Sequence, residues 1–116
     1  MTDLEMMRLC AQAMGYIRTD REISDEDFKN WQSYESLGNG WNPLEGNEAL
    51  EMVERFHIQV WPTTKPQHGD VEYTGWTAYI FKNGSASDPD LRRAIVTVVA
   101  KMQVSATPAV TVNKGT

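Results

Sequence analysis

The stretch 91-LRRAIVTVVAKM-102 decides the fold, because it carries an uninterrupted stripe of apolar residues. Their spacing of three and four residues predicts an amphipathic helix packed against a core. Asp88 and Pro89 precede it and are expected to supply its N-cap and its first helical residue. Valine is a mediocre helix former, so packing rather than propensity must hold this helix. The stripe consists of Leu91, Ala94, Ile95, Val98, Val99 and Met102.

Two more helices are predicted upstream. Thr2 and Glu5 form a capping-box pattern, and Gly15 stands where a C-terminal cap belongs, which predicts a helix over residues 3–14. The other helix begins after Asn42 or Asn47, and Gly46 favours the later start. Its apolar residues at helical spacing are Ala49, Met52, Val53 and Phe56.

Two strands are predicted between the second and the last of these helices. Residues 57–61 alternate with period two and end at Pro62, and residues 71–81 are rich in β-branched and aromatic side chains. Gly75 marks a bulge or a turn inside the longer strand, and Asn83-Gly84 closes it. The proline-containing and glycine-containing residues 63–70 are expected to form a loop.

Three segments have weaker patterns. Residues 16–30 are acidic and are expected to form a solvated loop, with a helical turn begun by Ser24 as the alternative. Residues 31–37 alternate weakly and are an uncertain strand. Residues 104–116 lack periodicity and are expected to form a tail or an added edge strand, which leaves 1–103 as a single domain.

These elements predict an α+β fold. We expect a small antiparallel sheet of three to four strands layered with about three helices, in an α-β-α sandwich-like arrangement with helices on one or both faces. The length of 116 residues, with 41% hydrophobic and 23% charged residues, is typical of one globular domain. The single cysteine excludes an internal disulfide framework. No membrane span or basic signal segment is visible, so the cytoplasm is the expected location.

The net charge of −5 is unevenly distributed. Residues 1–60 contain 12 acidic and 5 basic residues, a net charge of −7, whereas residues 61–116 contain 4 acidic and 6 basic residues, a net charge of +2. An acidic chain is a poor general nucleic-acid binder, because that affinity depends on neutralising phosphates. The acidic part can instead occupy a basic surface of a protein partner. Homo-oligomers are a further option, since exposed sheet edges pair readily.

Common catalytic motifs are missing from the sequence. There is no G-x-S-x-G, Walker or G-x-G-x-x-G motif, and His57 and His68 do not have the spacing of a zinc site. A composite metal site of His68, Asp70 and Glu72 is a weaker alternative, because alternate residues of a strand share a face. Cys10 lies on the apolar stripe of the first helix and is expected to be a core residue. We therefore predict no catalytic residue, metal or cofactor.

Five residues are candidates for ligand binding: Trp41, Asn42, Trp76, Arg92 and Arg93. Trp41 is expected to be either a core plug or a stacking wall for a ligand ring, and Asn42, before Pro43, either latches a loop or binds. Arg92 and Arg93 run against the macrodipole at a helix N-terminus, so they either hold an anion or pair with Asp88 and Asp90. Aromatic residues such as Trp76 are enriched both in cores and at binding sites.

Three stretches in this order carry a resemblance to a known family: the capped helix ending at Gly15, Trp41-Asn42-Pro43-Leu44 leading to Ala49-Leu50, and Leu91-Arg92-Arg93-Ala94-Ile95-Val96. Over residues 2–103 the chain resembles the phage ABA sandwich domain family. That resemblance implies an α-β-α layered fold and a bacteriophage origin, and therefore a host cytoplasmic location; it supplies no catalytic residues. The chain departs from the family at residues 19–30 and after Gln103.

These observations favour binding over catalysis. The first expectation is a viral anti-defence protein that sequesters a small nucleotide-like immune signal. The second is an inhibitor that binds a host defence complex through its acidic surface. A small metal-dependent hydrolase is the third, and a purely structural role in the phage is the fourth.

Overall fold

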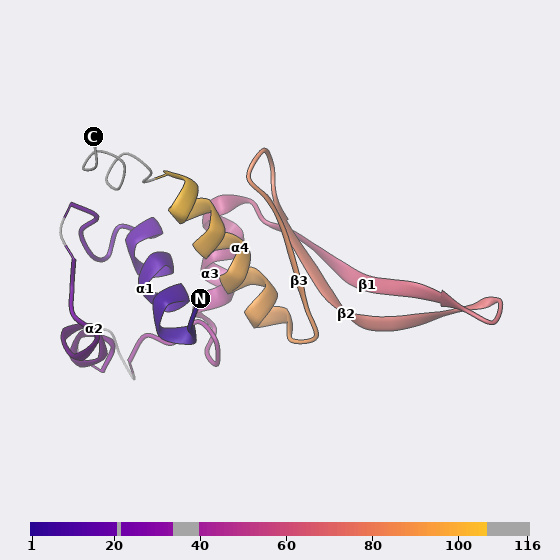
Figure 1. Cartoon of the computed structure of the whole chain (residues 1–116), viewed down its shortest axis with the longest axis horizontal. Coiled ribbons are helices and arrows are strands. Elements are labelled where there is room, and N and C mark those ends of the chain that lie inside the picture. The colour runs from indigo at the N-terminus through magenta and orange to yellow at the C-terminus, as the bar shows by residue number, and fades with distance from the viewer. Residues whose placement is uncertain (21, 34–39, 107–116) are drawn as a thin grey trace.

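The structure is a computed structural model that describes residues 1–20, 22–33 and 40–106. These residues form four helices and one three-stranded antiparallel sheet, which confirms the predicted α+β class (Figure 1). The helices are α1 (Asp3–Ala13), α2 (Asp25–Gln32), α3 (Glu48–Phe56) and α4 (Leu91–Ala106). The strands are β1 (Gln59–Gln67), β2 (Asp70–Ile80) and β3 (Gly84–Asp88), in the spatial order β1-β2-β3.

Both ends of α1 form as the sequence predicts. The Thr2 side chain accepts a hydrogen bond from the backbone N–H of Glu5, and the Glu5 carboxylate accepts one from the N–H of Thr2. These bonds hold the pKa of Glu5 below its ordinary value. At the other end Gly15 has a φ of +81°, and Tyr16 N donates to Ala11 O at 2.9 Å. This is a Schellman cap, which a residue able to adopt positive φ makes possible.

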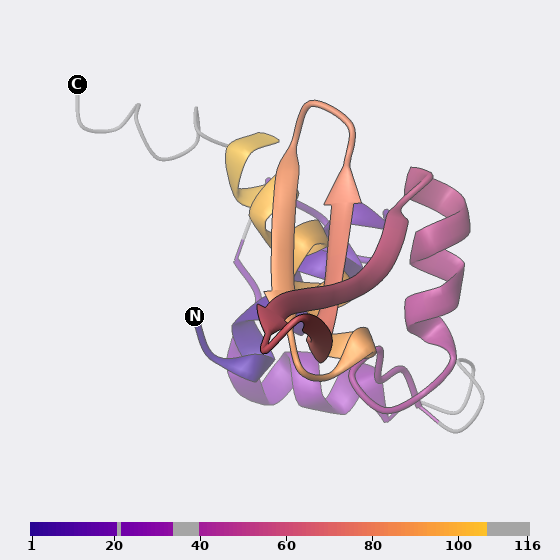
Figure 2. The ribbon, with the colours of Figure 1, turned by 90° about the vertical axis from the view of Figure 1, so that its right-hand side faces the viewer.

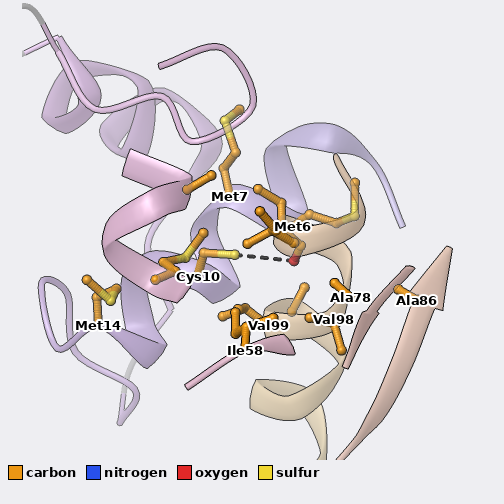
Figure 3. Packing of buried hydrophobic residues seen from close by; sticks show 14 of the residues in the cluster. Met6, Met7, Cys10, Met14, Ile58, Ala78, Ala86, Val98 and Val99 are labelled. Atoms are coloured by element: carbon orange, nitrogen blue, oxygen red, sulfur yellow. Dashed lines mark hydrogen bonds between the residues drawn. The ribbon is translucent and has the colours of Figure 1, made fainter. Parts of the chain in front are cut away.

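Helix α4 lies at the centre of the molecule. It packs on β2 and β3 on one side and on α1 and α3 on the other. Because both sides are covered, burial extends beyond the predicted stripe to Val96, Ala100 and Gln103. Figure 3 shows Cys10 of α1 donating a hydrogen bond to the carbonyl of Val96, at 3.4 Å, inside this core. The two-sided burial explains why a valine-rich segment forms a helix.

The predicted start of α4 is wrong by two residues. Asp88 is the last residue of β3, and Pro89 lies in the connection rather than at the first helical position. Asp90 makes the capping contacts instead: its side chain accepts from Arg92 N at 3.2 Å, and its carbonyl accepts from Ala94 N at 3.0 Å. The helix continues to Ala106, three residues past the predicted domain boundary, and residues 107–116 lie outside the described part.

Strands β1 and β2 form a hairpin longer than the sequence predicts. The expected loop over residues 63–70 is wrong, because β1 continues through Pro62 and Pro66 to Gln67. Proline is tolerated there since β1 is an edge strand. His68 and Gly69, with φ of +50° and +82°, make the tight turn. Of the bulge or turn that Gly75 was expected to mark, the structure has a bulge at the neighbouring Thr74, because Thr63 pairs with Gly75 and Thr64 pairs with Tyr73.

Two more elements differ from the sequence analysis. Strand β3 was not predicted; it pairs with β2 from Trp76↔Asp88 to Ile80↔Gly84. The acidic segment contains a full helix, α2, which Ser24 caps by accepting a hydrogen bond from Asp27 N. The uncertain strand at 31–37 is therefore wrong for Trp31 and Gln32, which belong to α2. The rest of that segment, from residue 34 onward, lies outside the described residues.

The layers follow one another on one side of the sheet. In Figures 1 and 2 the described helices all lie on the same side, with α4 nearest the sheet and α2 farthest from it. Helices on both faces, one of the two expected arrangements, are therefore not found among residues 1–20, 22–33 and 40–106. No helix in this part of the chain is long and apolar enough to cross a bilayer.

Gly75 gives a test of this packing. A Cβ atom there would lie 2.6 Å from Asp88 O and 2.8 Å from Pro89 Cα, both backbone atoms, and φ is +146°. Gly84 also has a positive φ, +99°, but a Cβ there would meet open space. We expect Gly75→Ala to lower the free energy of unfolding by more than about 2 kcal/mol, and Gly84→Ala by about 1–2 kcal/mol, in urea titrations. Equal losses would contradict the close approach of β2 to the start of α4.

Candidate functional site

Trp41 is a core residue in an aromatic cluster. Its side chain is buried, and its ring meets Tyr16 edge-on at 6.0 Å and Trp31 at 5.6 Å between ring centroids. Trp31 in turn stacks on Phe28 at 5.5 Å. The core-plug interpretation is therefore confirmed, whereas a stacking wall would need an open ring face. Neighbouring aromatic rings from α2 and the end of α1 occupy that space.

The backbone around Trp41 is tied to the end of α2. Trp41 N donates to Gln32 O at 2.9 Å, and the Gln32 side chain donates back to Trp41 O at 2.8 Å. Gly40 makes this approach possible, since a Cβ at its φ of +89° would lie 2.8 Å from Gln32 O. Helix α2 thus determines where Trp41 and Asn42 lie.

A hollow of about 340 Å³ opens where these two segments meet. We call it the Trp41 pocket; its lining residues are Lys29, Gln32, Ser33, Gly40, Trp41 and Asn42. Its size is within the range of small-molecule sites. The indole Nε1 of Trp41 is buried, and it has no hydrogen-bond partner in the described part of the chain. A buried donor left unpaired costs about 1–3 kcal/mol, so an acceptor that reached it would be stabilised.

Asn42 acts as a loop latch. Its Oδ1 accepts a hydrogen bond from Leu44 N at 3.1 Å, and its carbonyl accepts from Gly46 N at 2.8 Å. The extended conformation required before Pro43 aims the side chain into this turn. Asn42 also lines the Trp41 pocket, so its structural role leaves a ligand contact open.

Arg92 and Arg93 are committed to separate internal contacts. Arg92 Nε donates to Gly46 O at 2.8 Å and so fastens the turn after Pro43 to the start of α4. Arg93 pairs with Asp3 of α1, which raises the pKa of Arg93, and with Asp88 at 3.8 Å. Pairing with Asp88 was the expected alternative to anion binding. These carboxylates offset the unfavourable macrodipole.

The five predicted ligand residues therefore do not form one site. Trp41 and Asn42 line the same pocket, whereas Trp76 is half-buried in β2, paired in register with Pro62 and Asp88. Sequence analysis missed Lys29, Gln32 and Ser33, because the segment that contains them was assigned to a loop and an uncertain strand. The spacing of Phe28 and Trp31 behind the Ser24 cap was the signal available for this helix.

The candidates for metal and thiol chemistry have other surroundings. The described residues contain no group of three or more His, Cys, Asp or Glu side chains that could hold a metal ion, so the composite site of His68, Asp70 and Glu72 does not form there. Cys10 is fully buried in the core, and burial raises the pKa of its thiol. A buried protonated thiol is a poor nucleophile.

A second hollow of about 360 Å³ lies before and along α2, lined by Ile17, Arg18, Glu22, Ile23 and Asp27. Its cation is already engaged, because Arg18 forms a salt bridge with Asp20 at 2.5 Å. The sequence analysis placed no candidate residue here.

The chain was compared with known proteins at three levels. No family model, curated protein or solved structure matches it. The phage ABA sandwich resemblance therefore stays a prediction, carried by the residues quoted for it.

Arg92 and Arg93 are adjacent and chemically identical, which gives a matched stability test. Arg92 is partly buried and bonds a backbone carbonyl, whereas the ion pairs of Arg93 are exposed. We expect Arg92→Met to lower the free energy of unfolding by about 1–3 kcal/mol, and Arg93→Met by less than about 1 kcal/mol. Chemical denaturation monitored by tryptophan fluorescence measures both. A larger loss at Arg93 would contradict the roles assigned here.

Proposed function

We propose that the chain is a non-enzymatic phage accessory protein that binds a small nucleotide-like molecule in the Trp41 pocket and so sequesters an immune signal of the host. The observation that carries the proposal is the buried Trp41 Nε1, which lacks a partner among the described residues although its residue lines a pocket. Buried polar groups are almost always satisfied, so an orphaned donor on a residue that lines a hollow favours an acceptor there. Because Nε1 is closed to solvent, the ligand must displace a neighbouring side chain to reach it.

The lining chemistry favours the base of such a ligand over its phosphates. Gln32 and Ser33 stand at the end of α2, where the last carbonyls carry partial negative charge. The carbonyls of Lys29, Asn30 and Gln32 already accept internal hydrogen bonds, and each carbonyl oxygen has two lone pairs. Lys29 is the one cation among the described lining residues. A heterocycle that accepts from an indole N–H and donates to carbonyls fits this mixture, and Lys29 suits a single anionic group.

A ligand screen by thermal denaturation tests this proposal. A bound cyclic or ADP-ribose-type nucleotide, or its parent nucleoside, is expected to raise the melting temperature, because a ligand at a hundred times its Kd adds about 2.7 kcal/mol of stability. Trp41→Phe keeps an aromatic side chain but removes the pyrrole ring with its N–H, so it should reduce the shift, while Trp61→Phe on the exposed sheet should not. No shift with any ligand, or equal shifts in both variants, would refute the proposal.

A second candidate is an inhibitor that occupies the basic surface of a host defence complex. It is supported by the separation of charge in space as well as in sequence, since residues 1–20, 22–33 and 40–60, with 11 acidic and 4 basic side chains and a net charge of −7, lie toward the end of the molecule that holds α1, α2 and α3 (Figure 1). Glu22 and Glu26 are exposed there and form no salt bridge with any described residue.

Salt dependence separates this candidate from the first. A defence complex bound by the protein should associate more slowly as salt rises, because steering between opposite charges is screened. Glu22→Gln with Glu26→Gln should weaken that association, whereas the same loss of charge at Asp70 and Glu72, at the other end of the molecule, should not. An association rate that changes neither with salt concentration nor in the variant with Glu22→Gln and Glu26→Gln would contradict binding through an electrostatic surface.

A further inference from the structure

The β1–β2 hairpin extends beyond the helices as an arm. Figure 1 shows its distal half projecting away from α4 with no helix beside it, and Figure 2 shows the same ribbon crossing in front of the sheet. We define the hairpin arm as residues 62–76. An isolated two-stranded hairpin is marginally stable in water, so a projecting ribbon gains from a surface that covers it.

The register gives the arm one apolar face. Residues paired across an antiparallel ladder share a face, and alternate residues of β1 share one too. One face therefore begins at the fully buried Ala78, opposite Val60, and runs out along the arm. Its arm members include Pro62, Pro66, Val71 and Tyr73, which we call the apolar arm face.

The bulge at Thr74 creates this face. Thr63 pairs with Gly75 and Thr64 pairs with Tyr73, so Thr74 has no partner in the ladder. In a regular ladder without the bulge, Thr64 would oppose Thr74, and the side chains of β2 from Tyr73 to Asp70 would lie on the other face. Val71 and Tyr73 would then stand with Lys65 on the polar side. The sequence thus uses one irregular residue to keep the apolar side chains together.

The two faces of the arm differ sharply in exposure and chemistry. Tyr73 is 70% exposed and Val71 is 55% exposed on the apolar arm face. The opposite face is solvated and carries Lys65 and Glu72, whose charged groups lie 3.8 Å apart. Exposed apolar side chains gathered on one face, with charges confined to the other, are typical of a binding surface.

Both strands of the arm are edge strands, because β3 pairs with β2 only from Trp76 to Ile80. On the β1 edge, Pro62 and Pro66 have no N–H to donate, and prolines in edge strands are one of the devices that stop a further strand from pairing. Strand addition at the β2 edge would leave the exposed side chains of Val71 and Tyr73 uncovered. Packing on the apolar arm face is therefore favoured over extension of the sheet.

The charge distribution favours a second copy of the chain as the partner. The apolar arm face holds no charged residue, so two copies can meet there without an unpaired charge. The described residues up to 60 have 11 acidic and 4 basic side chains, a net charge of −7, and lie toward the other end of the molecule, whereas the arm has only Lys65, Asp70 and Glu72, a net charge of −1. Contact through the arms keeps the two acidic ends far apart, while most other contacts between copies would bring them together.

We propose that the apolar arm face binds the same face of a second copy of this chain, with the two arms antiparallel about a two-fold axis near Tyr73. The arm has six residues of β1, Pro62 to Gln67, and is two strands wide, which gives roughly 200 Å² per copy. A stable dimer buries about 800 Å² per partner, so the tip of each arm must also reach the root of the other. The root of the arm, where it joins the rest of the sheet, has apolar surface from Trp76 and from Pro89, which lies beside Gly75.

Sedimentation equilibrium over a wide concentration range tests the interface. The unmodified chain is expected to dimerise, and Val71→Thr with Tyr73→Thr should weaken the dimer by at least about tenfold. Lys65→Thr with Glu72→Thr is the matched change on the other face and should leave the dimer unchanged. Threonine suits strands, and circular dichroism checks that both variants fold. A monomeric unmodified chain, or equal effects of both variants, overturns the proposal.

Cross-linking tests the two-fold arrangement. Thr64 faces Tyr73 across the arm, so Thr64→Cys places a thiol near the axis, where a disulfide needs Cα atoms within about 7 Å. With oxidised glutathione as oxidant it should give a covalent dimer much faster than Lys65→Cys on the polar face. Cys10 is fully buried and does not compete. Equal rates for the two variants would overturn the proposed axis.

Neither experiment involves the Trp41 pocket, so the proposed dimer and the proposed ligand binding are tested independently.

Discussion

The structure depends on the burial of α4 from two sides. Because the sheet covers one side and α1 and α3 cover the other, this helix must be apolar around most of its circumference, and its small residues Ala94 and Ala100 are fully buried. Burial of this kind overrides the modest helix propensity of valine. It also places the other elements. Helices α1 and α3 pack on α4, and the sheet turns one face toward α4 and leaves the hairpin arm without a helical cover.

The sequence was sufficient where local signals agreed with this packing, and it failed where distant residues decided. The caps of α1 and the stripe of α4 were readable because short-range patterns and burial coincide. Strand β3, with the sequence GSASD, has no apolar alternation, and it forms because its backbone pairs with β2. Pro62 reads as a strand end in isolation, but its edge position makes it harmless. Helix α2 looked like a solvated loop because its acidic residues concealed Phe28 and Trp31, whose aromatic contacts hold it.

The candidate site was half predictable for the same reason. Trp41 and Asn42 are close in sequence, so their shared location followed from the chain. The partners of Arg92 and Arg93 are Gly46 and Asp3, which lie 46 and 90 residues away in sequence. Contacts with residues distant in sequence therefore compensate for two arginines at the positive end of the helix dipole, and no local sequence pattern revealed these contacts. Lys29, Gln32 and Ser33 reach the pocket because Gly40 allows the chain to press against the end of α2.

The two proposed surfaces lie at opposite ends of the molecule, and this separation has a consequence for binding. Helix α2, whose end lines the Trp41 pocket, lies far from the hairpin arm (Figure 1). A dimer formed through the arms would therefore leave both pockets unblocked by the second copy. A small ligand would then bind the two pockets with equal affinity, and binding at one pocket would not affect the other. Coupling between the pockets would require a shared element, such as α4, whose position changes when either pocket is occupied. A large host partner would behave differently, because a second acidic end can bind the same assembly with a high effective concentration. The geometry of the arm thus bears on avidity toward a macromolecule and leaves the intrinsic affinity for a small ligand unchanged.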